Sequence, residues 1–338
     1  MPAEHHPNRR TVLKGAAGAA ALLAAGAAAG TGAAQARPVC DRPTVVPFSA
    51  GNTLPAFRAP LGATDCHIHV FDPDRFPYPN PTSTPPPKAT IGDYLQLRSK
   101  LGTARTVIVT PSNYATDNRC TLDGIAQLGK VARGIGVIDD TFTDAQLADL
   151  DAGGIRGIRF NLTRPGGAGA ELIRPLAAKV AKFGWHVQIH MTADGILENI
   201  ANGNITDLPT DLVIDHMGRI PGATGTAHPA YAAICRLIDA KHTWVKLSGV
   251  YHESVSGPPT YADRSAIGKA FASYAPERMV WGSDWPHPTA SRGEVPMPDD
   301  AAMLDLFASW VPRHRDRQRI LVDNPASIYG FAPCRRRR

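Results

Sequence analysis

Short apolar and β-branched runs alternate with amphipathic stretches from Ala63 to Gly330. Eight runs are predicted as strands, at 63–70, 105–112, 133–139, 155–161, 185–191, 211–218, 243–249 and 278–285. The stretches between them carry apolar residues at helical spacing and end in Gly, Lys or His, as helices tend to do. Five of these predicted helices lie at 91–102, 121–132, 143–154, 172–184 and 229–242. Strands and helices that alternate in this way predict parallel strands joined by right-handed crossovers.

This pattern predicts an α/β fold in which the sheet closes into a (β/α)8 TIM barrel over residues 63–330. The length agrees, because a barrel of this kind takes about 250 residues. The alternative is an open doubly wound sheet. That fold usually has a glycine-rich phosphate loop after its first strand, whereas here the first strand ends in two histidines.

Residues 1–36 do not follow the barrel pattern. A twin arginine, Arg9 and Arg10, precedes a short region rich in Ala and Gly and a small-x-small site at 34–36. These features predict a twin-arginine export signal, and so short an alanine-rich region argues against a stable membrane span. We therefore expect a soluble periplasmic or extracellular protein whose mature chain begins near Arg37.

Two further segments flank the barrel. Residues 37–62 are rich in proline and lack periodicity, which predicts an extended arm, and residues 331–338 form a basic tail. The tail and the signal together account for the net charge of +6. The barrel itself is thus close to neutral, and nucleic acid is not expected as a partner. The five cysteines are scattered without a CxxC pair, which argues against a disulfide framework or a cysteine metal site but leaves one bridge open.

Polar and ionisable side chains gather where the predicted strands end. In TDCHIHVFDP (64–73), strand alternation places His67 and His69 on one face, where two neutral imidazoles could chelate a cation. Chemistry in a (β/α)8 barrel lies at the carboxyl ends of the strands. The residues predicted to share that end are His67, His69, Arg159, Asn161, His190, His216 and Asp284. Four histidines and an aspartate in one layer predict a functional site.

The sequence resembles the lactonase branch of the amidohydrolase superfamily, typified by 2-pyrone-4,6-dicarboxylate lactonases. The segments that carry the likeness are, in chain order, HVFDPDRFPYP, TVIVTPSNYATDN, GIRGIRFN, GWHV, VIDHMGR, WGSDWPHP and LVDNPASIYG. They are spread over nearly all of residues 63–330. Members of this superfamily are (β/α)8 barrels that hydrolyse esters, lactones and amides or decarboxylate acids.

The resemblance also implies roles for individual residues. Asp284 would be the general base that activates water, and His67, His69 and His216 would surround the scissile carbonyl, with His216 as a second catalytic residue. The side chains that would hold the carboxylates or the ring of the substrate are Tyr78, Ser112, Arg159 and Arg164. The spacing around Arg164 differs from that of the family.

The fifth strand departs from the pyrone lactonases, which have tyrosine there and work without a metal. This chain has His190, and the resemblance implies that a histidine at this point is a ligand in the metal-dependent branches. The predicted ligand set is His67, His69, His190 and Asp284, which suits one Zn²⁺ with room for a water. The fourth strand ends in Arg159 rather than in a residue that could bridge a second metal, and its charge opposes metal binding unless it faces the substrate.

Several neighbouring residues receive no predicted role. Asp215 should point away from the barrel lumen by strand alternation, and the sequence does not place Tyr251, His252 or His287 in the pocket.

We predict a hydrolase that opens a small anionic lactone by Asp-assisted attack of water, with one divalent metal as cofactor. A lactone isomerase and a metal-dependent decarboxylase of aromatic acids remain open as alternatives on the same fold. A non-enzymatic extracytoplasmic binding protein is a further alternative, but it would need no water-activating Asp284.

Overall fold

The structure is a computed structural model that describes residues 42–79, 85–164 and 168–332, in which eight parallel strands follow one another in sheet order β1 to β8. The strands are β1 (Thr64–Ile68), β2 (Arg105–Val109), β3 (Ala132–Gly136), β4 (Ile155–Asn161), β5 (His186–His190), β6 (Leu212–Ile214), β7 (Thr243–Leu247) and β8 (Met279–Trp281). All eight predicted strands are present, which confirms the (β/α)8 fold. The predicted export signal, the start of the arm at 37–41 and the end of the tail at 333–338 lie outside the described residues.

The sheet closes just beyond the end of β8. The Asp284 amide donates to the carbonyl of His67 at 2.9 Å, and the His69 amide donates to the carbonyl of Trp285 at 2.8 Å. These two bonds join the segment after β8 to β1. They bring Asp284 beside the two histidines, although more than two hundred residues separate them in sequence.

Several strands are shorter than predicted, and the difference falls at the functional end. His69 follows the last residue of β1, His216 lies beyond Ile214 at the end of β6, and Asp284 lies beyond Trp281 at the end of β8. His216 and Asp284 have positive φ angles of 52° and 70°. Left-handed backbone cannot continue a strand, so these side chains are aimed by turns rather than by strand alternation.

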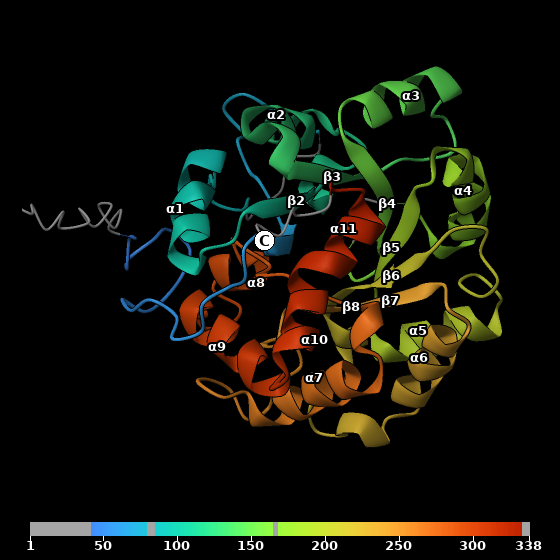
Figure 1. Cartoon of the computed structure of the whole chain (residues 1–338). Coiled ribbons are helices and arrows are strands. Elements are labelled where there is room, and N and C mark those ends of the chain that lie inside the picture. The colour runs from blue at the N-terminus through green and yellow to red at the C-terminus, as the bar shows by residue number, and fades with distance from the viewer. Residues whose placement is uncertain (1–41, 80–84, 165–167, 333–338) are drawn as a thin grey trace, which may run out of the picture. The chain divides into compact units, whose positions relative to one another are not determined.

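Helices surround the strands on the outside, and the last of them lies across one end of the barrel (Figure 1). They are α1 (Ile91–Leu101), α2 (Arg119–Leu128), α3 (Asp144–Ala152), α4 (Ile173–Val180), α5 (Ala193–Ala201), α6 (Pro229–Asp239), α7 (Ala262–Tyr274), α8 (Pro288–Ser291), α9 (Asp300–Trp310), α10 (His314–Gln318) and α11 (Asn324–Tyr329). Helices α1 and α3 begin with capping boxes at Thr90 and Thr143, which satisfy otherwise unpaired amides of the first turn. The five predicted helical segments are confirmed.

Apolar side chains inside the barrel meet the end of the chain at its amino-terminal mouth. Inward-facing Cys66, Val107 and Val213 belong to one buried cluster with Tyr329 and Phe331. Helix α11 lies across this mouth of the barrel (Figure 1). These side chains fill the interior of the barrel near its amino end, and Asp284 with its histidines lies at the opposite, carboxyl end.

The described part of the arm, residues 42–62, forms no helix or strand and packs against the barrel. Its Pro47 carbonyl accepts from the Trp285 indole nitrogen at 3.0 Å, and the Phe48 and Trp285 rings lie 5.7 Å apart. The arm thus supports the segment that carries Asp284. No helix among the described residues has the length and apolar character needed to cross a membrane.

Candidate active site

A pocket of about 450 Å³ lies at the carboxyl ends of the strands. Its lining includes His69, Arg159, His190, His216, His252 and Asp284. Most of these side chains are nearly inaccessible to solvent, which places their charges in a medium where electrostatic interactions are stronger than in water. The pocket therefore brings together six ionisable groups from six different strands or the loops that follow them.

The first strand supplies the paired histidines through an irregularity. The register of β1 against β2 shifts between Asp65 and Ile68, and Cys66 packs inside the barrel while His67 also reaches the polar centre of the lumen. Nε2 of His67 lies 3.2 Å from Nε2 of His69. The predicted pairing of the two imidazoles is confirmed, whereas the predicted strict alternation around Cys66 is not.

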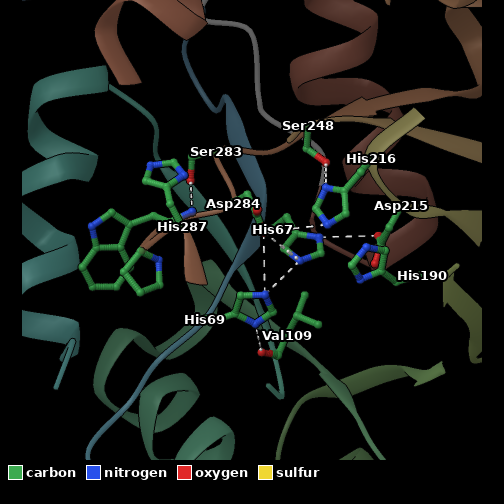
Figure 2. A network of polar contacts seen from close by, with 12 residues as sticks. His67, His69, Val109, His190, Asp215, His216, Ser248, Ser283, Asp284 and His287 are labelled. Atoms are coloured by element: carbon green, nitrogen blue, oxygen red, sulfur yellow. Dashed lines mark hydrogen bonds and ion pairs between the residues drawn. The ribbon is translucent and has the colours of Figure 1, made fainter. Parts of the chain in front are cut away.

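The protonation pattern of His69 follows from its partners. Its Nδ1 donates to the carbonyl oxygen of Val109 at 2.8 Å, because a carbonyl can only accept (Figure 2). Burial and then the neighbouring His67 lower the pKa of His69 to about 3, so the ring is neutral at pH 7. A neutral ring with its hydrogen on Nδ1 presents a lone pair from Nε2 to His67 and Asp284.

Asp284 lies at the centre of the histidines. Its Oδ1 is 3.5 Å from Nε2 of His67, 3.7 Å from Nε2 of His69 and 3.8 Å from Nε2 of His216. Burial alone would raise the pKa of Asp284, but the neighbouring imidazoles, His216 foremost, hold it well below the ordinary value. Asp284 is thus an ionised carboxylate in a buried pocket, the state that a general base requires.

His216 enters the pocket because β6 ends before it. Three consecutive residues, His216, Met217 and Gly218, have left-handed φ and ψ angles, and this turn rotates the imidazole into the lumen. Its Nδ1 lies 2.8 Å from the Ser248 hydroxyl, as Figure 2 shows, and its carbonyl accepts from the buried Arg264 guanidinium at 2.8 Å. The structure therefore places His216 beside Asp284, as expected.

Asp215 points into the barrel, so its predicted outward orientation is wrong. In β6 the inward-facing residue is Val213, and Asp215 keeps that parity while the turn redirects His216. The Asp215 carboxylate lies 3.1 Å from both Nε of Arg159 and Nζ of Lys246, and 3.0 Å from the Gln188 amide nitrogen. Burial would raise the pKa of Asp215, yet Lys246 and the other cations hold it well below the ordinary value.

Lys246 completes a buried ionic layer below the pocket. Its Nζ donates to Gln188 at 2.9 Å and lies 3.0 Å from Nδ1 of His67, and the side chain is fully buried. The sequence analysis did not single out this residue. The sequence feature that could have pointed to it is a lysine within TWVKL, the seventh strand, whose remaining residues are uncharged.

The donor set fits a metal ion. A tetrahedral Zn²⁺ with ligands at about 2.0–2.1 Å holds them about 3.3 Å apart, close to the separations of 3.2–3.7 Å among His67, His69 and Asp284. His67, His216 and Asp284 also offer atoms that lie within 4.8 Å of one another. Burial lowers the pKa of His67 to about 4, so its ring is neutral, as a ligand must be.

The tautomer of His67 decides whether its Nε2 offers a lone pair to a metal or a hydrogen to His69. Nδ1 of His67 lies 3.4 Å from Oδ1 of Asp215. If it carries the hydrogen and donates to this carboxylate, Nε2 is free to bind a metal, in the arrangement typical of histidine ligands. If Lys246 donates to Nδ1 instead, Nε2 carries the hydrogen and donates to His69. The same residues can therefore hold a cation or a proton.

The ring of His190 contacts that of His216, with centroids 4.7 Å apart. Its Nδ1 is 3.1 Å from a terminal guanidinium nitrogen of Arg159, and its Nε2 is 3.4 Å from one of Arg219. Guanidinium groups donate and never accept. Both ring nitrogens of His190 thus lie beside cations, and the role of His190 as a metal ligand stays a prediction.

The four predicted substrate-binding residues have different positions. Ser112, Arg159 and Arg164 line the pocket, and the Ser112 hydroxyl accepts from the Asn161 amide at 2.8 Å. Arg164 is partly exposed and pairs with Glu294 at 2.8 Å. Tyr78 does not line the pocket; its ring packs 5.0 Å from that of Tyr114.

Further residues at the site were not assigned by the sequence analysis. Arg292 lines the pocket beside Arg164 and pairs with the same Glu294 at 2.6 Å. Tyr251 donates to Oδ2 of Asp284, and Nε2 of His252 lies 3.4 Å from the same oxygen. Polar residues after the seventh strand were visible in GVYHES, but only the folded loop shows that they reach Asp284.

The fold and the polar pocket define a (β/α)8 enzyme with a histidine and aspartate centre. The chain belongs to the amidohydrolase family, whose family model matches residues 64–331.

Relatives within this family include lactone hydrolases. The chain is 36% identical to the 4-sulfomuconolactone hydrolase of Rhizobium radiobacter, over 81% of this chain and 92% of that protein. It is 33% identical to the 2-pyrone-4,6-dicarboxylate hydrolase of Comamonas testosteroni, over 83% and 94% of the two chains. It is equally similar, at 33% with the same coverage, to the D-galactarolactone isomerase of Agrobacterium fabrum (strain C58 / ATCC 33970).

Solved structures show the same fold. The ligand-free structure of an Agrobacterium tumefaciens protein superimposes with a TM-score of 0.74 at 32% identity, covering 83% of this chain and all of that one. This agreement supports the arrangement of strands that builds the pocket.

Proposed function

We propose that the protein is a hydrolase that opens an anionic lactone. The observation that carries the proposal is the pairing, within one pocket, of an ionised Asp284 among three imidazoles with the guanidinium of Arg159. The first centre can activate water, and the second can hold a negatively charged substituent. Two of the relatives are hydrolases of lactones that carry sulfonate or carboxylate groups, by their names.

The reaction follows from where these groups lie. The Asp284 carboxylate removes a proton from a water molecule as the water oxygen attacks the lactone carbonyl carbon. The ring carbon–oxygen bond then breaks, the ring oxygen leaves as an alcohol or enol after taking that proton from Asp284, and the product is an open-chain acid. The lone pair of His69 and the ring of His216 orient the water and the carbonyl beside Asp284.

We propose in addition that one divalent metal binds at this centre, held by His67, His69 and Asp284 with His216 in reach. A zinc ion, when bound, supplies Lewis acidity at the scissile carbonyl. The separations of the donor atoms and the neutral state of the rings support this proposal. Elemental analysis of the purified protein tests it, with one metal per chain as the expected result and negligible metal in a fully active protein as the contrary one.

Product analysis tests the reaction itself. Purified protein incubated with a panel of carboxylated and sulfonated lactones should release one proton per turnover and yield a product heavier by one water. An unchanged mass would indicate an isomerase, which the similarity to a D-galactarolactone isomerase makes the second candidate. Release of CO₂ would indicate a decarboxylase. Binding without turnover would contradict all three enzymatic functions.

We also propose export by the twin-arginine route, with cleavage near Arg37. The twin arginine at 9–10 and the small-x-small site at 34–36 support it. Mass spectrometry of the protein from its native cells should find a chain that begins within a few residues of Arg37. Retention of Met1 in a cytoplasmic protein would contradict the proposal.

A further inference from the structure

Asp284 presents its two oxygens to different surroundings. Oδ1 faces the imidazoles of His67, His69 and His216, whereas Oδ2 accepts from the Tyr251 hydroxyl and lies 3.4 Å from Nε2 of His252. The carboxylate also sits on left-handed backbone, at φ 70°, which is uncommon for a residue other than glycine. Both the side chain and the backbone of Asp284 are therefore held by surrounding contacts.

The Tyr251 hydroxyl continues into a buried chain of polar groups. Nδ1 of His287 lies 3.3 Å from the Tyr251 oxygen, and Nε2 of His287 lies 3.0 Å from Oδ2 of Asp300 at the start of α9. Tyr251 is 5% exposed, and His287 and Asp300 are fully buried. Because water does not surround these groups, each polar atom depends on its protein partner.

The direction of each hydrogen bond follows from what each group can donate. A carboxylate accepts only, so Tyr251 donates to Asp284 and Nε2 of His287 donates to Asp300. The Tyr251 hydrogen is thus already directed at Asp284, and Nδ1 of His287 must donate to the Tyr251 oxygen. Burial alone would lower the pKa of His287, but the Asp300 carboxylate beside it raises the pKa above the ordinary value, which agrees with a ring that donates from both nitrogens.

We propose that Tyr251, His287 and Asp300 form a hydrogen-bonded relay that fixes the plane of the Asp284 carboxylate and so aligns it to take the proton from water. None of the three lines the pocket; they are positioning residues that act through Asp284. Each donor in the relay is polarised by the next, so the Tyr251 hydroxyl holds Oδ2 more firmly than an isolated tyrosine would. Without that bond only His252 remains beside Oδ2, at 3.4 Å, and the carboxylate can turn out of the plane that presents it to the water.

The inference rests on Asp284 being the base of the proposed reaction, and the experiment separates the two ideas. Kinetics of the wild type are compared with Tyr251→Phe, Asp300→Asn, the double variant and Asp284→Asn, using an anionic lactone that the wild type opens. Tyr251→Phe should lower kcat by about tenfold or more while KM changes by less than about twofold, since binding groups are untouched and only base alignment is lost. Asp300→Asn should have a smaller effect of the same kind.

The double variant gives the readout that a merely structural role would not produce. Residues that act through one chain are not additive, so Tyr251→Phe with Asp300→Asn should lose no more than Tyr251→Phe alone. If the losses in kcat of the two single variants multiply in the double variant, the relay is refuted. Tyr114→Phe is the matched control: this buried hydroxyl accepts from the Asp72 amide at 2.9 Å, away from the relay, and the variant should keep wild-type kcat.

The outcomes for Asp284→Asn identify which idea fails. An inactive Asp284→Asn with a fully active Tyr251→Phe would refute the relay and leave the base in place, whereas an active Asp284→Asn would refute the base. Crystal structures of the wild type and Tyr251→Phe give a readout that needs no turnover. The wild type should show one orientation of the Asp284 carboxylate and the variant a rotated or divided one; an unchanged orientation would contradict the proposal.

Discussion

The histidines in and next to the pocket face opposite charges: a group of three faces a carboxylate, and a single histidine faces arginines. His67, His69 and His216 turn nitrogens toward the Asp284 carboxylate at 3.5–3.8 Å. His190, from the neighbouring β5, turns both nitrogens toward the guanidinium groups of Arg159 and Arg219 at 3.1 and 3.4 Å. The three histidines can bind a cation or hold a proton together with Asp284. His190 lies beside cations that could hold an anion.

The contrast shows that residue type does not define the chemistry of a histidine. An imidazole can donate, accept or ligate, and the neighbouring charges select among these roles. In this pocket the two sides complement each other, because a lactone that carries an anionic group needs water activated at one end and charge compensation at the other. The predictions below test whether the two sides are as distinct as their contacts indicate.

The largest expected effect is on the carboxylate side. Asp284→Asn removes the base but keeps the shape of the side chain, so kcat should fall by about 10²–10⁴-fold. Steady-state kinetics measure the loss, and an unchanged melting temperature shows that the fold persists. Wild-type kcat in a folded variant would remove Asp284 from the mechanism.

Metal content should distinguish the two groups of histidines directly. His69→Gln deletes a lone pair that lies 3.2 Å from His67 and 3.7 Å from Asp284, so the purified variant should lose most of its metal and activity. His190→Gln should keep the metal content of the wild type, because that ring faces guanidinium groups. Loss of metal in His190→Gln would support the ligand set predicted from the sequence, which includes His190.

The buried ionic layer should contribute more to stability than to chemistry. Lys246→Met leaves the buried Asp215 with fewer compensating charges, and loss of one partner from such a pair costs about 3–5 kcal/mol. Urea unfolding measures the change. The matched control is Lys182→Met at the exposed pair with Asp144, which should have no measurable effect; equal losses in both variants would contradict the interpretation.

On the guanidinium side the expected effect is on binding. Arg159→Met should raise KM for an anionic lactone by tenfold or more, since a hydrogen bond to a charged group contributes about 1.5–3 kcal/mol. A neutral lactone should be affected little. The comparison of the two substrates is the measurement, and equal losses on both would show that Arg159 supports the fold through Asp215 rather than binding the substrate.

The smallest effect concerns a histidine outside both groups. His186 is buried in β5 with no hydrogen-bond partner for either ring nitrogen, and burial lowers its pKa to about 3. The unfolded chain therefore binds a proton below about pH 6.5 that the folded chain does not accept until about pH 3. The free energy of unfolding should fall as the pH drops through this window.

His186→Gln measures that contribution. Unfolding of the variant should take up about one proton fewer than unfolding of the wild type. Its free energy of unfolding should therefore fall less steeply below pH 6, by roughly 1.4 kcal/mol per pH unit. Urea unfolding between pH 4 and 7 measures the slope for both proteins. An identical slope would show that His186 titrates in the folded protein as it does in the unfolded chain.

Much of the candidate site could be predicted from the sequence because it lies at strand ends. His67, His69, Arg159 and Asp284 were expected together, and the barrel brings them together, since parallel strands deliver their carboxyl ends to one mouth. Lys246 and Tyr251 were not assigned, because a lysine in a strand or a tyrosine in a loop has no distinctive spacing. Their importance comes from partners far away in the chain.

The sequence by itself determined the eightfold alternation of strands and helices, since hydrophobic periodicity is a local property that each segment carries on its own. Tertiary structure alone decided that Asp215 and His216 both enter the lumen, because Asp215 keeps the alternation of β6 while the left-handed turn redirects His216. It also decided that His190 faces arginines. The direction of a side chain at the end of a strand depends on the turn that follows and on charges from other strands. Neither can be predicted from the residues next to it in the sequence.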